Sequence, residues 1–154
     1  MERIYLPVEI KRFVRERAQN LCEYCRCPAA FSPDPFVIEH IIPLARKGKN
    51  KKKNLALACH GCNSCKHVAV TAYDSYSRKR VRLFHPRQHR WHEHFTWSED
   101  YSLIIGLTPI GRATVTRMQL NREGAVNLRR ALHNLGLHPQ SQSDVTALSS
   151  KDAL

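Results

Sequence analysis

The side chains with the clearest chemical potential lie between positions 39 and 66. Glu39 and His40 end an apolar segment, and Asn54 follows a run of lysines. Asn63 and Lys66 come directly after the second of two cysteine pairs. An imidazole ordinarily titrates at about pH 6.5, so His40 is suited to take a proton from water near neutral pH. The oxygens of Glu39 and Asn63 are hard ligands that suit Mg²⁺ or Mn²⁺. The group therefore has the parts that metal-assisted hydrolysis of a phosphodiester requires.

Each of these residues also has a plain structural explanation. A single Glu-His pair at a strand end is usually a solvated edge, and a single Asn before Leu is usually a turn residue. Glu39 and His40 are adjacent, so a regular strand would point them to opposite faces. For both to serve one site, the strand has to end or twist there. The combination between two cysteine pairs favours the chemical interpretation.

The cysteine pairs have the spacing of a zinc site. Cys22 and Cys25 form one CxxC pair, and Cys59 and Cys62 form the second. Such a knuckle bends two sulfurs toward one ion, so we predict a structural zinc held by these four residues. The alternative is two unrelated pairs of free or redox thiols, but a thioredoxin-like pair needs a βαβ context that neither has. We expect the neighbouring residues of ligand type to be bystanders: Cys27, Cys65, His60 and His67.

Residues 20–68 resemble the HNH endonucleases, whose pattern is [DEH]-H-I-x-P, then N-L-x-x-x-C, then C-[NH]-x-x-K. The resemblance implies a ββα-metal core that cuts DNA, with His40 as general base and Glu39 and Asn63 as ligands of the divalent ion. It also implies that Asn54 fixes the orientation of His40 and that Lys66 contacts a phosphate. The chain departs from the family name in two residues: Asn63 stands where the name implies a histidine, and Glu39 stands in place of the commoner Asp.

A formal net charge of +12 predicts a polyanionic partner, and nucleic acid is the first candidate. Segment 46–53 contains six cations that we expect to contact DNA phosphates: Arg46, Lys47, Lys49, Lys51, Lys52 and Lys53. Segment 78–90 is a second candidate track, in which Arg87 is assigned to DNA. The alternative for both segments is a solvated charge run. A second metal site among the clustered histidines is a weaker hypothesis, because no CxxC-like bend accompanies them: His85, His89, His92 and His94.

The pattern of apolar, capping and turn residues predicts the elements. We expect helices over 8–19, from about 63, over 109–120 with Thr108 as N-cap, and over 122–135 with Asn121 as N-cap and Gly136 at the end. We expect strands over 36–42 and 55–58, and a hairpin from HFTW and YSLIIG. The fold class is therefore α+β: a small zinc-stapled domain with a ββα-metal core and a C-terminal strand-and-helix cap. Residues 1–138 form one domain with its catalytic core at about 20–70, and residues 139–154 are a disordered tail.

Two rivals to a DNA-cutting enzyme remain open from the sequence. A non-catalytic zinc-ribbon module that binds DNA or RNA would explain the cysteines and the charge, but not the three motif positions of His40, Asn54 and Asn63. A ribosome-associated or protein-associated zinc module is the second rival. We expect a cytoplasmic location, because no signal peptide and no membrane-spanning run is visible. One active site per chain makes a homodimer possible for double-strand cutting.

Overall fold

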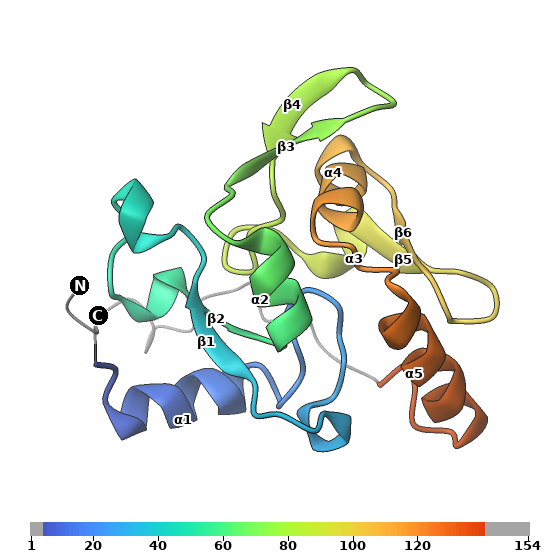
Figure 1. The fold of residues 1–154 in the computed structure, drawn as a ribbon, viewed down its shortest axis with the longest axis horizontal. Helices are drawn as coiled ribbons and strands as arrows, with labels where there is room; N and C mark the ends of the chain where they lie inside the picture. The colour runs from blue at the N-terminus through green and yellow to red at the C-terminus, as the bar shows by residue number, and fades with distance from the viewer. Residues whose placement is uncertain (1–4, 141–154) are drawn as a thin grey trace.

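The computed structural model describes residues 5–140. The helices are α1 (Val8–Arg17), α2 (His60–Lys66), α3 (Trp91–His94), α4 (Pro109–Arg117) and α5 (Glu123–Asn134). The strands are β1 (Val37–His40), β2 (Leu55–Ala58), β3 (Thr71–Asp74), β4 (Lys79–Arg82), β5 (Phe95–Trp97) and β6 (Ile104–Gly106). The strands form three separate antiparallel pairs, β1–β2, β3–β4 and β5–β6. Figure 1 shows the β3–β4 hairpin standing out from the body of the molecule above α4.

The N-terminal half contains a ββα unit, made of β1, β2 and α2. β1 pairs with β2 so that Glu39 lies opposite Ala56 and His40 opposite Leu55. β2 is buried along its whole length, as its apolar sequence LALA requires, and leads directly into α2. The chain before β1 is joined to β2 at Leu57: the Glu23 N–H donates to the Leu57 carbonyl at 2.9 Å, and the Leu57 N–H donates to the Glu23 carboxylate at 2.8 Å.

The C-terminal half packs α4 against two hairpins. The Thr108 hydroxyl accepts from the Gly111 N–H at 3.0 Å and caps α4, which confirms the capping residue read from the sequence. Gly111 is required at its position because an added Cβ would lie 2.0 Å from the His94 carbonyl oxygen. The close approach of α4 to the β5–β6 region therefore depends on this glycine.

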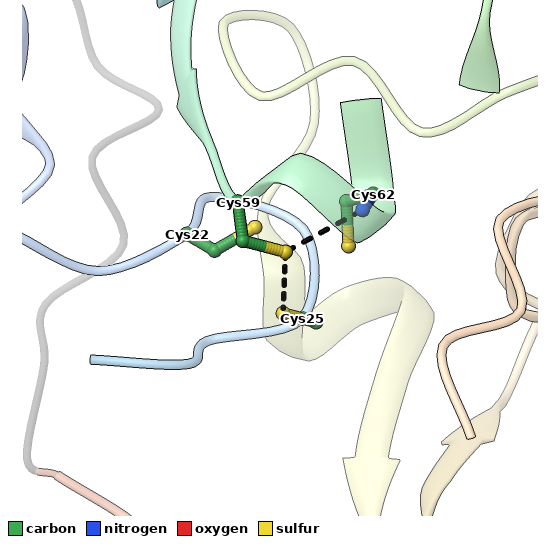
Figure 2. Close-up of side chains that lie close together, drawn as sticks. All are labelled: Cys22, Cys25, Cys59 and Cys62. Carbon is green, nitrogen blue, oxygen red and sulfur yellow. Dashed lines mark hydrogen bonds between the residues drawn. The ribbon is translucent and has the colours of Figure 1, made fainter. Parts of the chain in front are cut away.

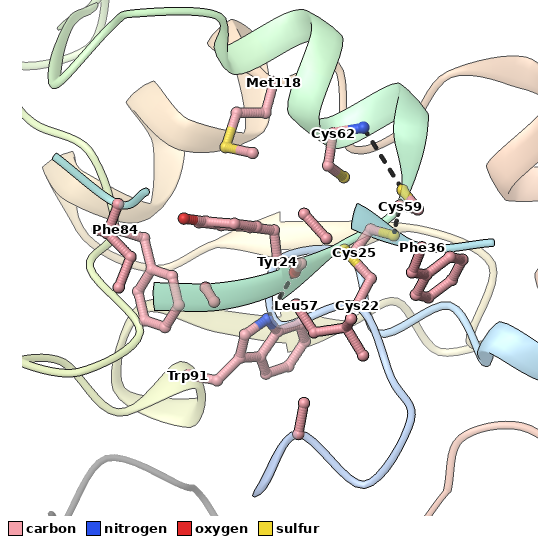
Figure 3. Close-up of a cluster of buried hydrophobic side chains, with 14 of the residues drawn as sticks. Cys22, Tyr24, Cys25, Phe36, Leu57, Cys59, Cys62, Phe84, Trp91 and Met118 are labelled. Atoms are coloured by element: carbon pink, nitrogen blue, oxygen red, sulfur yellow. Dashed lines mark hydrogen bonds between the residues drawn. The ribbon is translucent and has the colours of Figure 1, made fainter. Parts of the chain in front are cut away.

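One hydrophobic core contains residues from both halves (Figure 3). Trp91 is 1% exposed, and its indole N–H donates to the Tyr24 carbonyl at 2.9 Å. The Phe84 ring packs edge-on against the rings of Tyr24 and Phe95. The cysteine knuckle, β2, α3 and α4 are thus parts of one packed interior.

The α+β fold class is confirmed, together with the zinc-stapled ββα core and the strand-and-helix cap. Several predicted element bounds are corrected. β1 is shorter than 36–42, and α1 ends at Arg17 rather than at 19. α2 starts at His60, three residues before the predicted start, because the Cys59 sulfur caps it by accepting from the Cys62 N–H at 3.4 Å.

The prediction of Asn121 as a helix N-cap is wrong. Arg122 stands at the N-cap position of α5, and the Asn121 amide instead bonds the Ile104 N–H and carbonyl, both at 2.8 Å. This pairing ties the segment between α4 and α5 to β6. Residues 141–154 of the expected tail lie outside the described part of the chain. No helix within residues 5–140 combines the length and apolarity needed to cross a bilayer.

Candidate active site and metal centre

Four cysteine sulfurs lie in one buried cluster. Cys22, Cys25, Cys59 and Cys62 place their sulfurs within 4.8 Å of one another (Figure 2). The Cys25 and Cys59 sulfurs are 3.7 Å apart. A tetrahedron with Zn–S bonds of about 2.3 Å has edges of about 3.8 Å. The cluster therefore has the donor type, number and spacing of a structural zinc site, as the spacing of the pairs predicted.

Local backbone structure brings the two pairs together. The Cys22 N–H donates to the Cys27 carbonyl at 2.9 Å, and the Arg26 N–H donates to the Cys22 carbonyl at 2.9 Å. Arg26 has a φ of 63°, which turns the chain back and closes the knuckle. Cys59 and Cys62 stand at the start of α2. A metal in this cluster thus connects the N-terminal knuckle to the helix of the ββα unit.

Arg122 is a contact of the cysteine cluster that the sequence did not reveal. Its guanidinium donates to the Cys59 sulfur at 3.2 Å and to the Cys62 sulfur at 3.7 Å. Gly61 leaves room for this contact, because a Cβ there would lie 2.6 Å from the guanidinium. A cation beside thiolates offsets their negative charge, so Arg122 joins the C-terminal half to the metal centre.

Cys27 and Cys65 lie outside the four-sulfur cluster. Burial raises the pKa of the Cys27 thiol to about 12, which keeps it protonated at neutral pH. Its sulfur faces the Pro28 carbonyl at 3.7 Å. Among residues 5–140, no other three His, Cys, Asp or Glu side chains lie close enough together to hold one metal ion.

Glu39 is buried at the interface of β1 and α2. It is 6% exposed; Tyr24 donates to one carboxylate oxygen, and the Lys66 ammonium lies 3.3 Å from the other. Burial raises the pKa of Glu39, and the positive charge of Lys66 opposes this rise. Burial and the neighbouring carboxylate raise the pKa of Tyr24 well above its usual value, so its hydroxyl remains a donor. Tyr24 was not predicted as a site residue.

His40 is half-buried at the end of β1. It lies next to the segment of six cations at 46–53, which we call the basic loop. Its Nε2 lies 3.0 Å from the Asn50 side-chain oxygen. Asn50 was not singled out from the sequence, where it is one polar residue in a run of lysines. Within the described residues, no hydrogen bond joins His40 to Glu39 or to Asn63. The adjacent residues Glu39 and His40 contact different partners, as expected for neighbours on a strand.

Asn54 joins the turn after β1 to the basic loop. Its side-chain oxygen accepts from the Ile42 N–H at 2.8 Å, and its amide donates to the carbonyls of Ile42 and Lys49, each at 2.9 Å. Gly48 passes so close that a Cβ would lie 1.7 Å from the Ile42 carbonyl oxygen. These contacts fix the backbone two residues after His40.

Asn63 and Lys66 lie one turn apart on α2. Asn63 is half-buried, whereas Lys66 is 1% exposed. The Lys66 ammonium donates to the Ile41 carbonyl at 2.8 Å in addition to its pairing with Glu39. In this arrangement Lys66 neutralises the carboxylate rather than facing solvent, where a phosphate would lie.

The basic loop is largely open to solvent. Five of its cations are exposed: Arg46, Lys47, Lys49, Lys51 and Lys53. Lys52 is half-buried, with its ammonium 4.3 Å from the centre of the Phe13 ring. The placement of Arg87 on DNA is corrected: its side chain is 3% exposed and forms an ion pair with Glu23, so it serves the interior.

A family model described as HNH endonuclease matches residues 22–69. The matched segment begins at the first cysteine and ends just after α2, so it covers the whole ββα unit and the cysteine cluster. The resemblance read from the sequence is thereby confirmed over this segment, and it indicates a nuclease-type function acting on nucleic acid. A search of curated proteins finds no match.

The two implied metals fit their residues differently. The cysteine cluster fits zinc in donor type and spacing. A carboxylate and an amide oxygen suit a hard divalent ion in donor chemistry. Both oxygens of Glu39, however, already face proton donors, Tyr24 and Lys66. A cation that contacts Glu39 directly would therefore share the carboxylate with these donors or displace the Lys66 ammonium.

Proposed function

We propose that this protein is a metal-dependent endonuclease that hydrolyses phosphodiester bonds of DNA. The observation that carries the proposal is the HNH endonuclease match over residues 22–69. It is supported by the order of elements in that segment, β1, β2 and α2, beside a four-cysteine cluster.

His40 is the general base in this proposal. The oxygen of Asn50 accepts at Nε2, so Nε2 holds the proton of the neutral ring and Nδ1 has the lone pair. Nδ1 is then the atom that takes a proton from the attacking water. Asn54 acts through the backbone: it fixes the turn after β1 and thereby the position of His40.

Glu39 and Asn63 would hold one divalent ion, Mg²⁺ or Mn²⁺, which supplies positive charge to the phosphate and the leaving oxygen. Lys66 contacts a phosphate in the proposal once it has left Glu39. The phosphate contact requires the Lys66 ammonium to move, because it now pairs with the carboxylate at 3.3 Å, and the same movement would open Glu39 to the ion.

The exposed cations of the basic loop would position the DNA backbone. They run from the last residue of η2 (Leu44–Arg46) into η3 (Lys52–Asn54), after the turn that follows His40. Contacts of this kind bind phosphates without reading the base sequence, so the loop supplies affinity rather than specificity. Its closure by Asn54 brings these charges near the strand end that carries the base.

The test is cleavage of a supercoiled plasmid with Mg²⁺, Mn²⁺ or neither, by the parent protein and by His40→Ala. We expect cleavage only with a divalent ion, and a loss of roughly 10²- to 10⁴-fold in His40→Ala. His92→Ala removes an exposed imidazole from α3 and serves as the matched control. An intact plasmid under all conditions, or equal cleavage by His40→Ala, would refute the proposal.

The zinc-ribbon alternative is not favoured by the family match. It predicts that the parent binds nucleic acid without cutting it, and that Glu39→Ala and Asn63→Ala bind with unchanged affinity. The same plasmid assay, accompanied by a binding measurement on these variants, separates the two functions.

A further inference from the structure

The β3–β4 hairpin has one packed face. Ala72 and Val81 lie opposite each other and pack with Ala113 of α4. Asp74 is on the same face, where both of its carboxylate oxygens accept from the Arg112 guanidinium, at 3.0 and 2.9 Å. Asp74 is the only acidic residue of segment 71–82. The hairpin's negative charge is therefore turned inward and neutralised by Arg112.

The outer face of the hairpin carries the opposite chemistry. The cross-strand pairs Thr71–Arg82 and Tyr73–Arg80 point away from α4. Tyr73 is 54% exposed, both arginines are exposed, and Arg80 donates to the Thr71 hydroxyl at 3.2 Å. An exposed ring beside guanidinium groups is the combination that binds bases by stacking and phosphates by charge.

The outer face continues into a cleft next to the candidate active site. The cleft has a volume of about 410 Å³. Thr71 and Arg82 line it on the hairpin side, and Ile41 and Lys66 line it on the side of the ββα unit. Ile41 follows His40 in the chain, and Lys66 pairs with Glu39. One surface thus leads from the exposed Tyr73 ring to the immediate neighbours of both proposed active-site residues.

We propose that the outer face of the β3–β4 hairpin and this cleft bind an unpaired segment of the nucleic-acid substrate. Tyr73 stacks on a base, Arg80 and Arg82 bind phosphates, and one nucleotide enters the cleft. This inference rests on the proposed nuclease function and adds the substrate form to it.

Size and lining favour an unpaired strand over a duplex. A cleft in the volume range of small-molecule sites admits a single nucleotide, not a double helix. Its wall includes the apolar side chains of Ile41, Leu83 and Phe84, which suit the faces of a base. Stacking on Tyr73 likewise needs a base that has left its pair.

The test is binding to a short fluorescent single-stranded oligonucleotide and to the duplex of the same sequence, measured by anisotropy across salt concentrations. All proteins in this experiment carry His40→Ala, so that the oligonucleotide is not cleaved, and this variant serves as the parent. Tyr73→Ala and the double variant Arg80→Gln/Arg82→Gln are compared with Arg12→Gln/Arg130→Gln. The last variant removes the same charge from exposed positions on α1 and α5.

We expect tighter binding of the single strand than of the duplex. Tyr73→Ala should weaken single-strand affinity by roughly five- to a hundredfold, and Tyr73→Phe should restore it. The Arg80/Arg82 variant should reduce the salt slope of log affinity by about 0.7 for each phosphate that is no longer bound, whereas the Arg12/Arg130 variant should not. Equal affinity of the Tyr73→Ala variant and its parent, or of single strand and duplex, would overturn the inference. Plasmid cleavage by the native protein would leave the proposed function standing in that case.

Discussion

Two asparagines contact the candidate base and the turn behind it from different sides. Asn50 accepts from the His40 ring, and Asn54 bonds the backbone of Ile42 and Lys49. In the proposed mechanism, Asn50 determines which ring nitrogen has the proton, whereas Asn54 fixes the backbone turn that follows His40. A partner that orients a reacting histidine typically contributes about ten- to a hundredfold to activity.

We predict that Asn50→Ala lowers kcat of plasmid cleavage by about tenfold and changes KM little, because the ring loses its acceptor while the cations remain. Asn50→Asp keeps an acceptor oxygen and should retain more activity than Asn50→Ala. The measurement is the steady-state rate of plasmid cleavage over a range of plasmid concentrations. A change confined to KM in Asn50→Ala would mean that the residue binds DNA and does not orient His40.

The cysteines offer a matched pair of substitutions. Cys25→Ser removes one sulfur of the cluster, whereas Cys27→Ser changes a nearby sulfur outside it. We expect Cys25→Ser to lose bound zinc and to lower the free energy of unfolding by several kcal/mol, since the metal contributes folding energy directly. Cys27→Ser should keep about one zinc per chain. Metal analysis and urea denaturation measure both effects, and full zinc content in Cys25→Ser would remove that cysteine from the ligand set.

The segment between β4 and α3 joins the hairpin to the core and contains two histidines, His85 and His89. His85 accepts from the Arg87 N–H through Nδ1 at 3.2 Å, and its own backbone N–H donates to His89 at 3.0 Å. Burial lowers the pKa of His85 to about 4, and the charges of His89, Lys66 and Arg82 add to this effect. The folded protein therefore keeps His85 neutral well below pH 6.5.

This shift predicts acid sensitivity. An unfolded His85 takes up a proton at about pH 6.5, but the folded one does so only near pH 4. Between these values the unfolded state binds more protons, so the free energy of unfolding falls as the pH is lowered from about 6.5 to about 4. After a discount for partial exposure, the contribution of His85 is about 1–2 kcal/mol.

His85→Asn is the variant that isolates this contribution, because the Asn side-chain oxygen can replace Nδ1 as an acceptor without titrating. Protonation of the zinc ligands affects the parent and the variant alike. We expect the loss of stability between pH 6.5 and pH 4, measured by urea denaturation, to be smaller in His85→Asn. Parallel stability curves for the two proteins would show that His85 does not titrate in this way.

The molecule as a whole is held together by a core that both halves share. Trp91 of α3 bonds the cysteine knuckle at Tyr24, and Arg122 bonds the sulfurs of Cys59 and Cys62. We propose on this basis that the ββα unit and the C-terminal cap unfold as one domain, as the sequence predicted for residues 1–138.

Trp91→Ala tests this cooperativity. Loss of the buried indole should lower the free energy of unfolding by about 3–5 kcal/mol. If the two halves are one unit, far-ultraviolet circular dichroism and zinc release should report a single shared transition that moves to lower urea concentration. A zinc-release curve that stays in place while the helical signal shifts would show that the halves unfold separately.

Local signals in the sequence identified the features that depend on neighbouring residues. The CxxC spacing placed four sulfurs in one cluster, and Thr108-Pro109 marked the start of α4. β2 was predicted from four consecutive apolar residues, and all four are buried in the structure. In each case a short segment contains the whole physical cause.

Features that depend on distant partners were missed. Arg122 reaches Cys59 across 63 positions, and Trp91 reaches Tyr24 across 67. The β3–β4 hairpin was not predicted, because its outer face is polar and its packed face is completed by α4. Arg87 looked like part of a basic track, and only the fold reveals its buried partner Glu23.

The Asn54 side chain holds the turn behind His40 through bonds that are separate from the exposed charges of the basic loop. The Gly48 N–H donates to the Pro43 carbonyl at 3.0 Å, and the Asn54 side chain joins Ile42 to Lys49, so no lysine side chain takes part in these closing bonds. We expect side-chain exchanges at the exposed Lys51 and Lys53 to leave these bonds in place, whereas Lys52 packs on the Phe13 ring. In the proposed nuclease, the affinity for DNA can therefore change at Lys51 and Lys53 while the bonds that fix the turn behind His40 stay the same.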